Sequence, residues 1–326
     1  MGFKLRDIEF KYGLSLAPMA GYSDRAMRLL ALEHGAEYSV TEMVSARAVV
    51  YRDKKTARLA KIRADEGRVM LQLFGSEPEI MAEAATLLSS GVPEDGCVPP
   101  FAIDINMGCP VNKIFNNGEG SALMRSPEKI EKIVSAVAAA TVLPVSVKLR
   151  LGIDREHISA VECALAAEAG GAELVTVHGR TRSEMYSGCA DMALVAEVVS
   201  ALRIPVVANG DINGGEAALR ALRETGASGI AVGRGAVGNP FVFSEIVAAL
   251  SGGEFTPPTE RERAQTALRH VALAVEDKGE RVAIPESRGQ IAAYIRSFRG
   301  AAALRGKINS AATYAELCEI LLSTIS

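Results

Sequence analysis

Residues 104–110, with the sequence DINMGCP, contain the side chain that first points to chemistry, the thiol of Cys109. An apolar run leads into this segment and predicts a buried strand that ends at Asn106, after which Gly108 lets the backbone turn. The ring of Pro110 restricts the backbone next to Cys109 and removes a backbone donor. An isolated cysteine is more often a buried packing residue, but this setting predicts a thiol presented at the carboxyl end of a strand.

Three more polar side chains stand at or near the ends of apolar runs. Gln72 must be hydrogen-bonded if it is buried, and its amide both donates and accepts, which suits a ring that carries N–H and C=O groups. Lys148 is more often functional than structural at such a position, because lysine is seldom buried without a partner. It is interpreted either as a Schiff-base nucleophile or as a cation facing an anionic ligand. His178 is the only histidine at a predicted strand end.

Anion-binding features gather near the end of the same region. Arg180 and Arg182 are candidate anion binders, and we expect Arg180 to contact the substrate. Residues 209–212 (NGDI) and 233–240 (GRGAVGNP) are rich in glycine, and the second contains Gly-x-Gly-x-x-Gly. A Rossmann fingerprint is rejected because the motif comes late and no later strand ends in an acid about 20 residues on. Two adjacent loops of this kind predict a phosphate site.

Eight short apolar runs, separated by helical patterns, must position these groups. The predicted strands are residues 14–17, 38–41, 69–74, 102–106, 145–149, 174–178, 206–209 and 229–232. The helices between them include 24–34, 78–89, 127–140, 157–169, 192–202 and 215–225. Parallel neighbours need a crossover, so this alternation indicates a parallel sheet. Eight units predict an α/β protein with a closed (β/α)₈ TIM barrel, whose active site lies at the carboxyl ends of the strands.

The pattern changes after residue 250. Residues 251–258 (SGGEFTPP) have a linker composition, and helices are predicted at 260–278, 286–298 and 313–323. We therefore expect a barrel domain at 1–250 and a small helical domain at 251–326. Between 281 and 310 there are six basic residues and one acid, a local charge of +5 in a chain whose net charge is −3. This asymmetry points to a polyanionic partner.

The composition limits other functions. The chain has 326 residues, 48% of them hydrophobic and 23% charged, as in ordinary soluble globular proteins. No apolar run of about 20 residues predicts a membrane span, and residues 1–7 have no apolar signal core, so a cytoplasmic protein is expected. The cysteines are five and widely spaced, and the four histidines form no His-x-x-x-His pair, so neither a disulfide scaffold nor a metal site is expected. No role is assigned to Cys97, Cys163, Cys189 or Cys318.

In combination, these segments resemble the tRNA-dihydrouridine synthases, and most closely their bacterial B-type branch. The resemblance covers about residues 8–325 and is carried by residues 17–21 (APMAG), 104–110, Lys148, 178–182 (HGRTR), 209–211 (NGD) and 233–234 (GR). It implies a monomeric, FMN-binding barrel with a helical tRNA-binding domain. It also implies the reduction by NADPH of the C5–C6 double bond of uridine in the tRNA D-loop.

The resemblance assigns roles by position. Cys109 would be the general acid for C5, hydride would pass from flavin N5 to C6, and Asn106 would help to position the uracil. The flavin would be bound by Pro18, Met19, Ala20, Gln72, Lys148 and His178, and its phosphate by Asn209, Gly210, Asp211, Gly233 and Arg234. On the helical domain, Arg288, Arg299 and Arg305 fit the family's tRNA-binding face. A thiol of ordinary pKa, ~8.5, stays protonated at neutral pH and can donate.

The chain departs from the family in one segment. Relatives usually carry a basic residue, a histidine and an aromatic residue where this chain has Gly289, Gln290 and Ala293. This difference concerns contacts with tRNA and leaves the flavin residues untouched.

Three alternatives remain open. One is a flavin barrel acting on a small molecule, as in dihydroorotate- or dihydropyrimidine-type dehydrogenases. Another is a Schiff-base aldolase using Lys148, which would bind no flavin. The third is a tRNA-binding protein whose chemistry is incidental.

Overall fold

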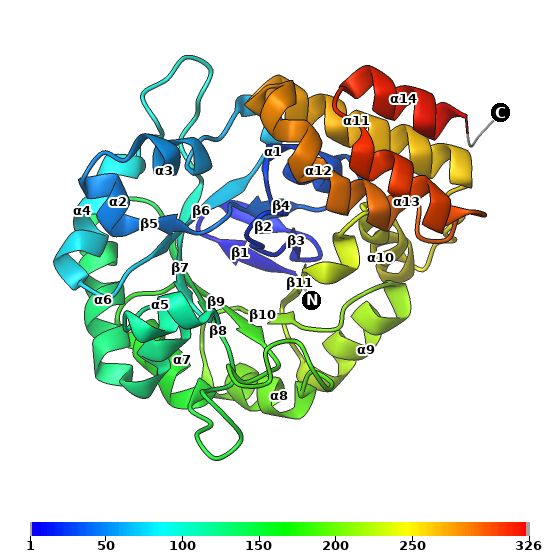
Figure 1. Ribbon diagram of the computed structural model, residues 1–326. Coiled ribbons are helices and arrows are strands. Elements are labelled where there is room, and N and C mark those ends of the chain that lie inside the picture. The colour runs from blue at the N-terminus through cyan, green and yellow to red at the C-terminus, as the bar shows by residue number, and fades with distance from the viewer. Residues whose placement is uncertain (1, 324–326) are drawn as a thin grey trace.

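The computed structural model describes residues 2–323, except the side chains of residues 54 and 55, and within this part eight parallel strands close into a barrel (Figure 1). Pairing of β11 with β3 and of β4 with β6 leaves the ring without an open edge. In chain order the barrel strands are β3 (Leu14–Leu16), β4 (Tyr38–Val40), β6 (Val69–Phe74), β7 (Ala102–Met107), β8 (Val145–Leu149), β9 (Leu174–His178), β10 (Val206–Asn209) and β11 (Gly229–Val232). The predicted barrel is confirmed, and each predicted strand agrees to within one residue at its ends. A short extra strand, β5 (Val44–Ser45), adds to β6.

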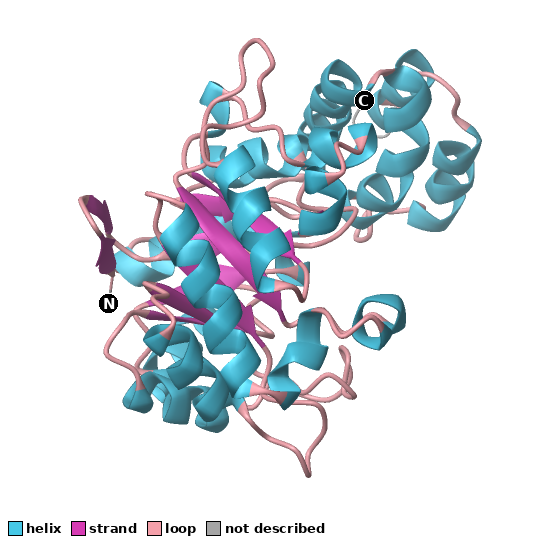
Figure 2. Ribbon diagram, turned by 90° about the vertical axis from the view of Figure 1, so that its left-hand side faces the viewer, coloured by secondary structure: helices cyan, strands magenta, loops and turns pink. Residues whose placement is uncertain are grey.

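An N-terminal hairpin, which the sequence analysis did not predict, closes the amino end of the barrel. Its strands β1 (Phe3–Leu5) and β2 (Ile8–Phe10) pair antiparallel. Phe10 is 1% exposed, and its ring lies 5.0 Å from that of Tyr38 at the start of β4. Figure 2 shows the hairpin and the C-terminal helices on opposite sides of the barrel.

Seven helices surround the strands within the described residues: α1 (Arg25–Glu33), α4 (Pro78–Leu88), α6 (Pro127–Ala140), α7 (Ala160–Ala169), α8 (Met192–Ala201), α9 (Gly215–Thr225) and α10 (Phe241–Ser251). Side chains cap several of them, for example Ser126, which accepts from the backbone of Lys129 at 3.3 Å. Short helices lie in the loops: α2 (Ala46–Val50), α3 (Lys54–Leu59), α5 (Asn112–Asn116), and the 3₁₀ turns η1 (Ala64–Glu66), η2 (Gly120–Arg125) and η3 (Arg234–Ala236).

The prediction that α7 begins at residue 157 is wrong. The side chain of Asp154 accepts from the backbone N–H groups of Glu156 and His157, at 3.0 and 2.9 Å. This local turn competes with helix formation, so α7 begins at Ala160.

The C-terminal part consists of α11 (Glu260–Lys278), α12 (Glu280–Tyr294), α13 (Ala301–Ser310) and α14 (Tyr314–Leu322), which share an apolar core of their own. Thr259 and Glu262 form a capping box that fixes the start of α11 as predicted. The prediction placed the next helix at 286–298, whereas α12 starts before Pro285 and contains it. Burial of Ala283 and Ile284 keeps this turn helical although the proline removes one backbone donor. Helix α13 was not predicted.

The C-terminal helices pack on the barrel mainly through α11 and α1. Lys278 Nζ on α11 lies 2.7 Å from Asp24 Oδ2, and Asp24 also caps α1 through the Met27 N–H. The division at residue 250 remains a proposal, supported by the separate apolar core. Among the described helices, none is long and apolar enough to span a bilayer.

Candidate active site

One cavity of about 1120 Å³ lies at the carboxyl ends of the strands. All the residues predicted to bind the cofactor line it, together with Cys109 and Asn106; they are Pro18, Met19, Ala20, Gln72, Lys148, His178, Asn209, Gly210, Asp211, Gly233 and Arg234. The structure therefore brings together residues that the chain separates by more than two hundred positions. Their roles remain predictions.

A chain of buried hydrogen bonds leads to Cys109. Asp104 accepts from Ser146 Oγ at 2.5 Å and from Gln72 Nε2 at 2.6 Å. Gln72 Oε1 accepts from Asn106 Nδ2 at 2.8 Å, and Asn106 Oδ1 accepts from the backbone N–H of Cys109 at 2.9 Å. The strand positions of Gln72, Asp104 and Ser146 make this possible, because β6, β7 and β8 are neighbours in register.

This chain has a fixed direction. An ionised carboxylate only accepts hydrogen bonds, so Asp104 turns the NH₂ group of Gln72 toward itself and the carbonyl of Gln72 toward Asn106. Asn106 must then use its carbonyl for the Cys109 loop, and the second hydrogen of its NH₂ group has only a weak partner, Met43 Sδ at 4.0 Å on the cavity wall. Burial raises the pKa of Asp104, although Ser146 and Gln72 oppose the shift.

The Cys109 thiol is half-buried. Burial raises its pKa, and the backbone N–H of Val111 and the cations Arg150 and Lys148 oppose the rise only in part. Ser121 also fixes the loop, since its Oγ donates to the Cys109 carbonyl at 2.8 Å. The site therefore holds a neutral thiol, which is a proton donor.

Lys148 is a half-buried cation at the end of β8. Its Nζ donates to Asn209 Oδ1 at 3.2 Å, and burial, helped by Arg150, lowers its pKa to about 8. Asn209 is itself held by the Ala231 carbonyl, to which its Nδ2 donates at 2.7 Å. An ammonium group with a single neutral partner among the described residues is suited to an anionic ligand.

His178 is buried beside several cations. Burial, together with Lys148, Arg150, Arg180 and Arg234, holds its pKa well below the ordinary value. The imidazole is therefore neutral at pH 7. Its Nε2 lies 3.5 Å from a guanidinium nitrogen of Arg180, so Nε2 serves as an acceptor there.

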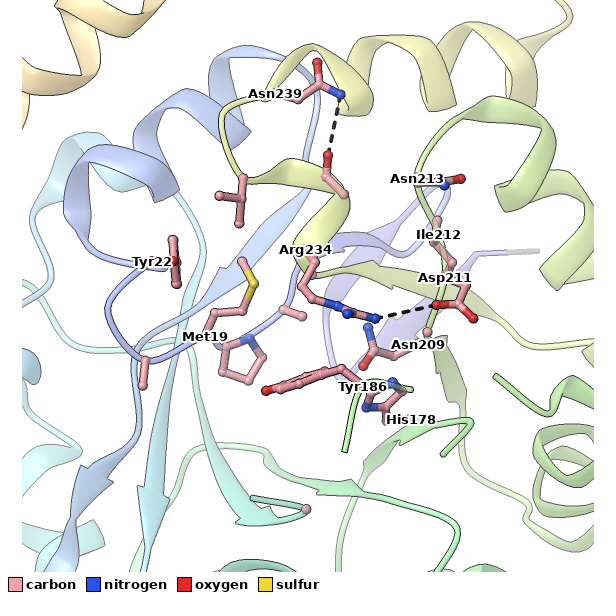
Figure 3. A pocket seen from close by; sticks show the side chains of 18 of the residues that line it. Met19, Tyr22, His178, Tyr186, Asn209, Asp211, Ile212, Asn213, Arg234 and Asn239 are labelled. Atoms are coloured by element: carbon pink, nitrogen blue, oxygen red, sulfur yellow. Dashed lines mark hydrogen bonds and ion pairs between the residues drawn. The ribbon is translucent and has the colours of Figure 1, made fainter. Parts of the chain in front are cut away.

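The two glycine-rich loops, in residues 209–212 and 233–240, line one end of the cavity (Figure 3). The guanidinium of Arg234 lies 3.7 Å from Asp211 Oδ1 and 4.7 Å from the centroid of the Tyr186 ring. A Cβ added to Gly235 would lie 2.5 Å from the Ile212 carbonyl, so only glycine fits between the two loops. The backbone of Asp211 is left-handed, with φ of 52°.

The side chain of Asp211 is held by protein groups. Its Oδ2 accepts from Arg180 Nη2 at 2.8 Å and from the backbone of Ala190 at 2.7 Å. A carboxylate repels an anion, so its side chain contributes by holding Arg234 in place.

The first loop supplies small and apolar lining. Pro18, Met19 and Ala20 follow β3, and Ser23 fastens them, because the backbone of Met19 donates to its Oγ at 2.9 Å. The backbone of Gly21 is anchored by the carboxylate of Glu42.

Four arginines predicted to bind the substrate do not line the cavity. Arg180 is fully buried and donates to the carbonyls of Ser187 and Gly188, at 2.9 and 2.7 Å, so it supports the loop after β9. Arg288 donates to the Ala311 carbonyl at 2.9 Å and ties α12 to the segment after α13. Arg299 and Arg305 are exposed on the helical part.

The cavity also contains residues that the sequence analysis did not assign: Met43, Arg150, Tyr186, Arg263, Ala293, Tyr294, Arg296 and Ser297. Arg150 is buried and donates to the Gly108 carbonyl at 3.0 Å, which fixes the turn before Cys109. Its position two residues after Lys148 was a signal that could have been used. Arg263 and Arg296 reach the cavity only because the helices fold back, and no local pattern predicts that. A Cβ on Gly238 would lie 2.5 Å from that of Ala293, which shows how closely α12 approaches the barrel loop.

Comparison with known proteins gives a consistent result. The family model described as dihydrouridine synthase matches residues 15–326. A protein of Treponema pallidum named probable tRNA-dihydrouridine synthase is 35% identical over 96% of this chain and 93% of its own length. The probable tRNA-dihydrouridine synthase 1 of Synechocystis sp. is 40% identical over 94% of this chain and 86% of its own. The tRNA-dihydrouridine synthase B of Shewanella oneidensis is 38% identical over 88% and 87%, respectively.

These matches extend over the barrel, the cavity-lining loops and the C-terminal helices alike, so the chain belongs to the dihydrouridine synthase family.

Proposed function

We propose that this protein is a cytoplasmic tRNA-dihydrouridine synthase that reduces the C5–C6 double bond of uridine in the tRNA D-loop, using FMN and NADPH. The observation that carries the proposal is the position of a neutral thiol, Cys109, in the same cavity as the half-buried cation Lys148 and two glycine-rich loops. The relatives' names support the choice of tRNA as substrate.

The residues present fit FMN. Lys148 has spare donors facing the cavity, and Arg234 provides a second cation at the glycine-rich end. A Cβ added to Gly210 would lie 2.7 Å from that of Ala190, so no side chain fits there, whereas a Cβ added to Gly233 would first meet Met19 Sδ at 3.7 Å, so the backbone of Gly233 is accessible to a ligand's phosphate. FMN, once reduced by NADPH, would supply the hydride that C6 receives.

The chain's own groups would then do three things. Cys109 donates its thiol proton to C5 while negative charge develops on the pyrimidine. Asn106, whose orientation is fixed by Gln72, offers its remaining N–H to a uracil carbonyl. Lys148, through its positive charge, stabilises negative charge on the bound ring system.

The helical part supplies charge for the RNA. Among the described residues, no ion pair engages Arg281, Arg288, Arg296, Arg299, Arg305 or Lys307, and the one acid of this window, Glu286, pairs with Lys278 at 3.0 Å. The five exposed bases of this window therefore remain available to phosphates, whereas Arg288 is half-buried and donates to the Ala311 carbonyl. Arg263 and Arg296 extend this charge to the edge of the cavity.

The test is dihydrouridine mapping at nucleotide resolution in tRNA from cells that lack this gene. We expect D-loop dihydrouridine to disappear, to return with the wild-type gene and with Cys189→Ala, and not to return with Cys109→Ala. Cys189 is exposed and serves as the matched cysteine control. Unchanged dihydrouridine in the absence of any paralogue, with a yellow purified protein, would instead favour a small-molecule dehydrogenase. A colourless protein would favour an aldolase that uses Lys148.

A further inference from the structure

A second basic surface lies on the barrel, across the cavity from the C-terminal helices. It comprises Lys113, Phe115, Arg125, Lys129 and Arg182, which we call the α5–α6 surface. Figure 1 shows α5 and α6 on one side of the barrel and α12 and α13 on the other. No role in the proposed chemistry has been given to this surface.

Phe115 orders two of its cations. The guanidinium of Arg125 lies 4.6 Å from the centroid of the Phe115 ring, and that of Arg182 lies 4.2 Å from it. Arg182 Nη2 also donates to Asn112 Oδ1 at 2.5 Å, which links the loop after β9 to α5. Cations held over an aromatic ring lose less freedom when they bind a ligand.

A cleft of about 500 Å³ adjoins this ring, and Phe115, Arg125, Ser126 and Lys129 contribute to its lining. Within the described part of the chain, Lys113, Arg125 and Lys129 make no ion pair, and Arg125 is exposed. The nearby acid Glu128 accepts from Ser126 Oγ at 3.1 Å. Four cations thus face two acids, Glu119 and Glu128, which leaves a positive surface.

The surface is joined directly to the catalytic segment. Val111, two residues after Cys109, lines the cavity, and the next residue, Asn112, begins α5. After α5, the Ser121 hydroxyl donates a hydrogen bond to the Cys109 carbonyl at 2.8 Å. The α5–α6 surface therefore lies beside the loop that follows Cys109, where we expect an RNA strand that delivers a base to Cys109 to leave the cavity.

We propose that the α5–α6 surface binds backbone phosphates of the tRNA on the side of the target uridine opposite the C-terminal helices. This inference rests on the proposed function. A uridine that leaves its stack costs a few kcal/mol, and holding the backbone on both sides of it keeps the base extruded. Phosphate contacts of this kind position the RNA and carry no sequence information.

The experiment compares the tRNA Kd of the FMN-loaded wild-type protein with that of Arg125→Glu/Lys129→Glu at several salt concentrations. We expect the Kd to rise about tenfold or more and the slope of log K against log salt to fall by about 2, one unit for each lost cation. The double variant Arg203→Glu/Arg223→Glu carries the same change of charge on exposed residues away from the cavity mouth, and we expect its Kd to stay within about twofold of wild type.

The FMN spectrum and Tm of each variant report on folding, and Arg125→Gln/Lys129→Gln replaces the charge reversal if that variant is unstable. A Kd within about twofold of wild type in the folded variant overturns the inference while leaving the proposed function intact. An equal loss in the control variant overturns it too, because the effect would then come from net charge alone. A wild-type protein that binds no tRNA contradicts both the inference and the proposed function.

Discussion

Cys109 is the residue on which the proposed chemistry depends. Since burial raises the pKa of its thiol, the proton is present at neutral pH and is lost only in alkaline solution. We expect dihydrouridine formation under single turnover to be constant between about pH 6 and 8 and to fall above that range. Cys109→Ala should lower the rate by about 10²–10⁴-fold without changing FMN content, and Cys163→Ala on α7 should not. A rate that rises with pH would point to a thiolate nucleophile instead.

Asp104 acts on Cys109 through Gln72 and Asn106. Asp104→Ala would leave Gln72 Nε2 and Ser146 Oγ buried without an acceptor, at about 1–3 kcal/mol each. In Asp104→Asn the side chain keeps one acceptor but also carries an NH₂ donor. This variant should therefore lose less stability than Asp104→Ala, but it allows the amide group of Gln72 to adopt the opposite orientation. We therefore expect Asp104→Asn to retain FMN and most of its denaturation free energy but to raise the KM for tRNA. If both variants lost the same stability and neither changed the KM for tRNA, Asp104 would have only a structural role.

The positive charge of Lys148 lowers the stability of the folded protein when no ligand is bound. Its folded pKa of about 8 lies below the unfolded value of 10.5, so folding is penalised below pH 8 and the penalty is relieved as the pH rises from 8 to 10.5. We expect Lys148→Met to stabilise the FMN-free protein at pH 7 by about 2 kcal/mol, with a difference that disappears near pH 10.5, and to lose FMN affinity. Denaturation of both FMN-free proteins at several pH values is the measurement, and a Met variant less stable at pH 7 would contradict it.

The sequence was informative about residues that stand at strand ends, because a closed parallel barrel brings all such ends together. Gln72, Lys148 and Asn209 could be placed in one site on that ground alone. Arg180 could not be distinguished from a ligand-binding arginine, since only the folded loop after β9 shows that its donors are used internally. Arg263 and Arg296 depend on how two separate cores dock, which no local pattern encodes.

At the scale of elements, α11 is joined to the start of α1 by an ion pair between the half-buried Lys278 and the buried cap residue Asp24. Burial alone would raise the pKa of Asp24, but His270, Lys278 and the Met27 N–H together lower it. This pairing stabilises the protein above the unfolded pKa of 3.8 and is lost as the pH falls through the lower folded value. The contact matters for function because Asp24 follows the loop at 17–21 that lines the cavity.

We expect Lys278→Met to lower the free energy of unfolding by about 2 kcal/mol, because it leaves a buried carboxylate unpaired. The control is Arg269→Met, which removes the exposed pair with Glu33 between the same two helices and should cost less than about 1 kcal/mol. Chemical denaturation of both variants at pH 7 decides the point. Equal losses of unfolding free energy in the two variants would mean that the burial of Asp24 does not make its ion pair more important for stability than the exposed pair.

The helix starts predicted from the sequence were correct where a capping residue is present. They were wrong where a side-chain turn precedes the helix or a proline lies within it. Ser126 and Thr259 mark the starts of α6 and α11. Asp154 delays α7 through its own turn, and Pro285 lies inside α12 because tertiary burial outweighs the lost donor.

The whole molecule is acidic, yet two groups of bases flank the mouth of the cavity. Those of α12 and α13 lie on one side of the cavity and those of the α5–α6 surface on the other. The proposed boundary at residue 250 separates two apolar cores but not the active site, whose rim includes Arg263 and Arg296 from the helical part.

The N-terminal hairpin has a kinetic consequence. Because Phe3, Leu5 and Phe10 fill the amino end of the barrel, we expect the reductant and the RNA of the proposed reaction to use the same opening at the carboxyl end. In the proposed reaction we therefore expect NADPH to leave before tRNA enters, so double-reciprocal plots at different NADPH concentrations should be parallel lines, and excess NADPH should inhibit competitively against tRNA. Intersecting lines would show that both can be bound at once. In the proposed reaction, closure of the amino end by these apolar side chains therefore makes the two substrates bind one after the other at the carboxyl end.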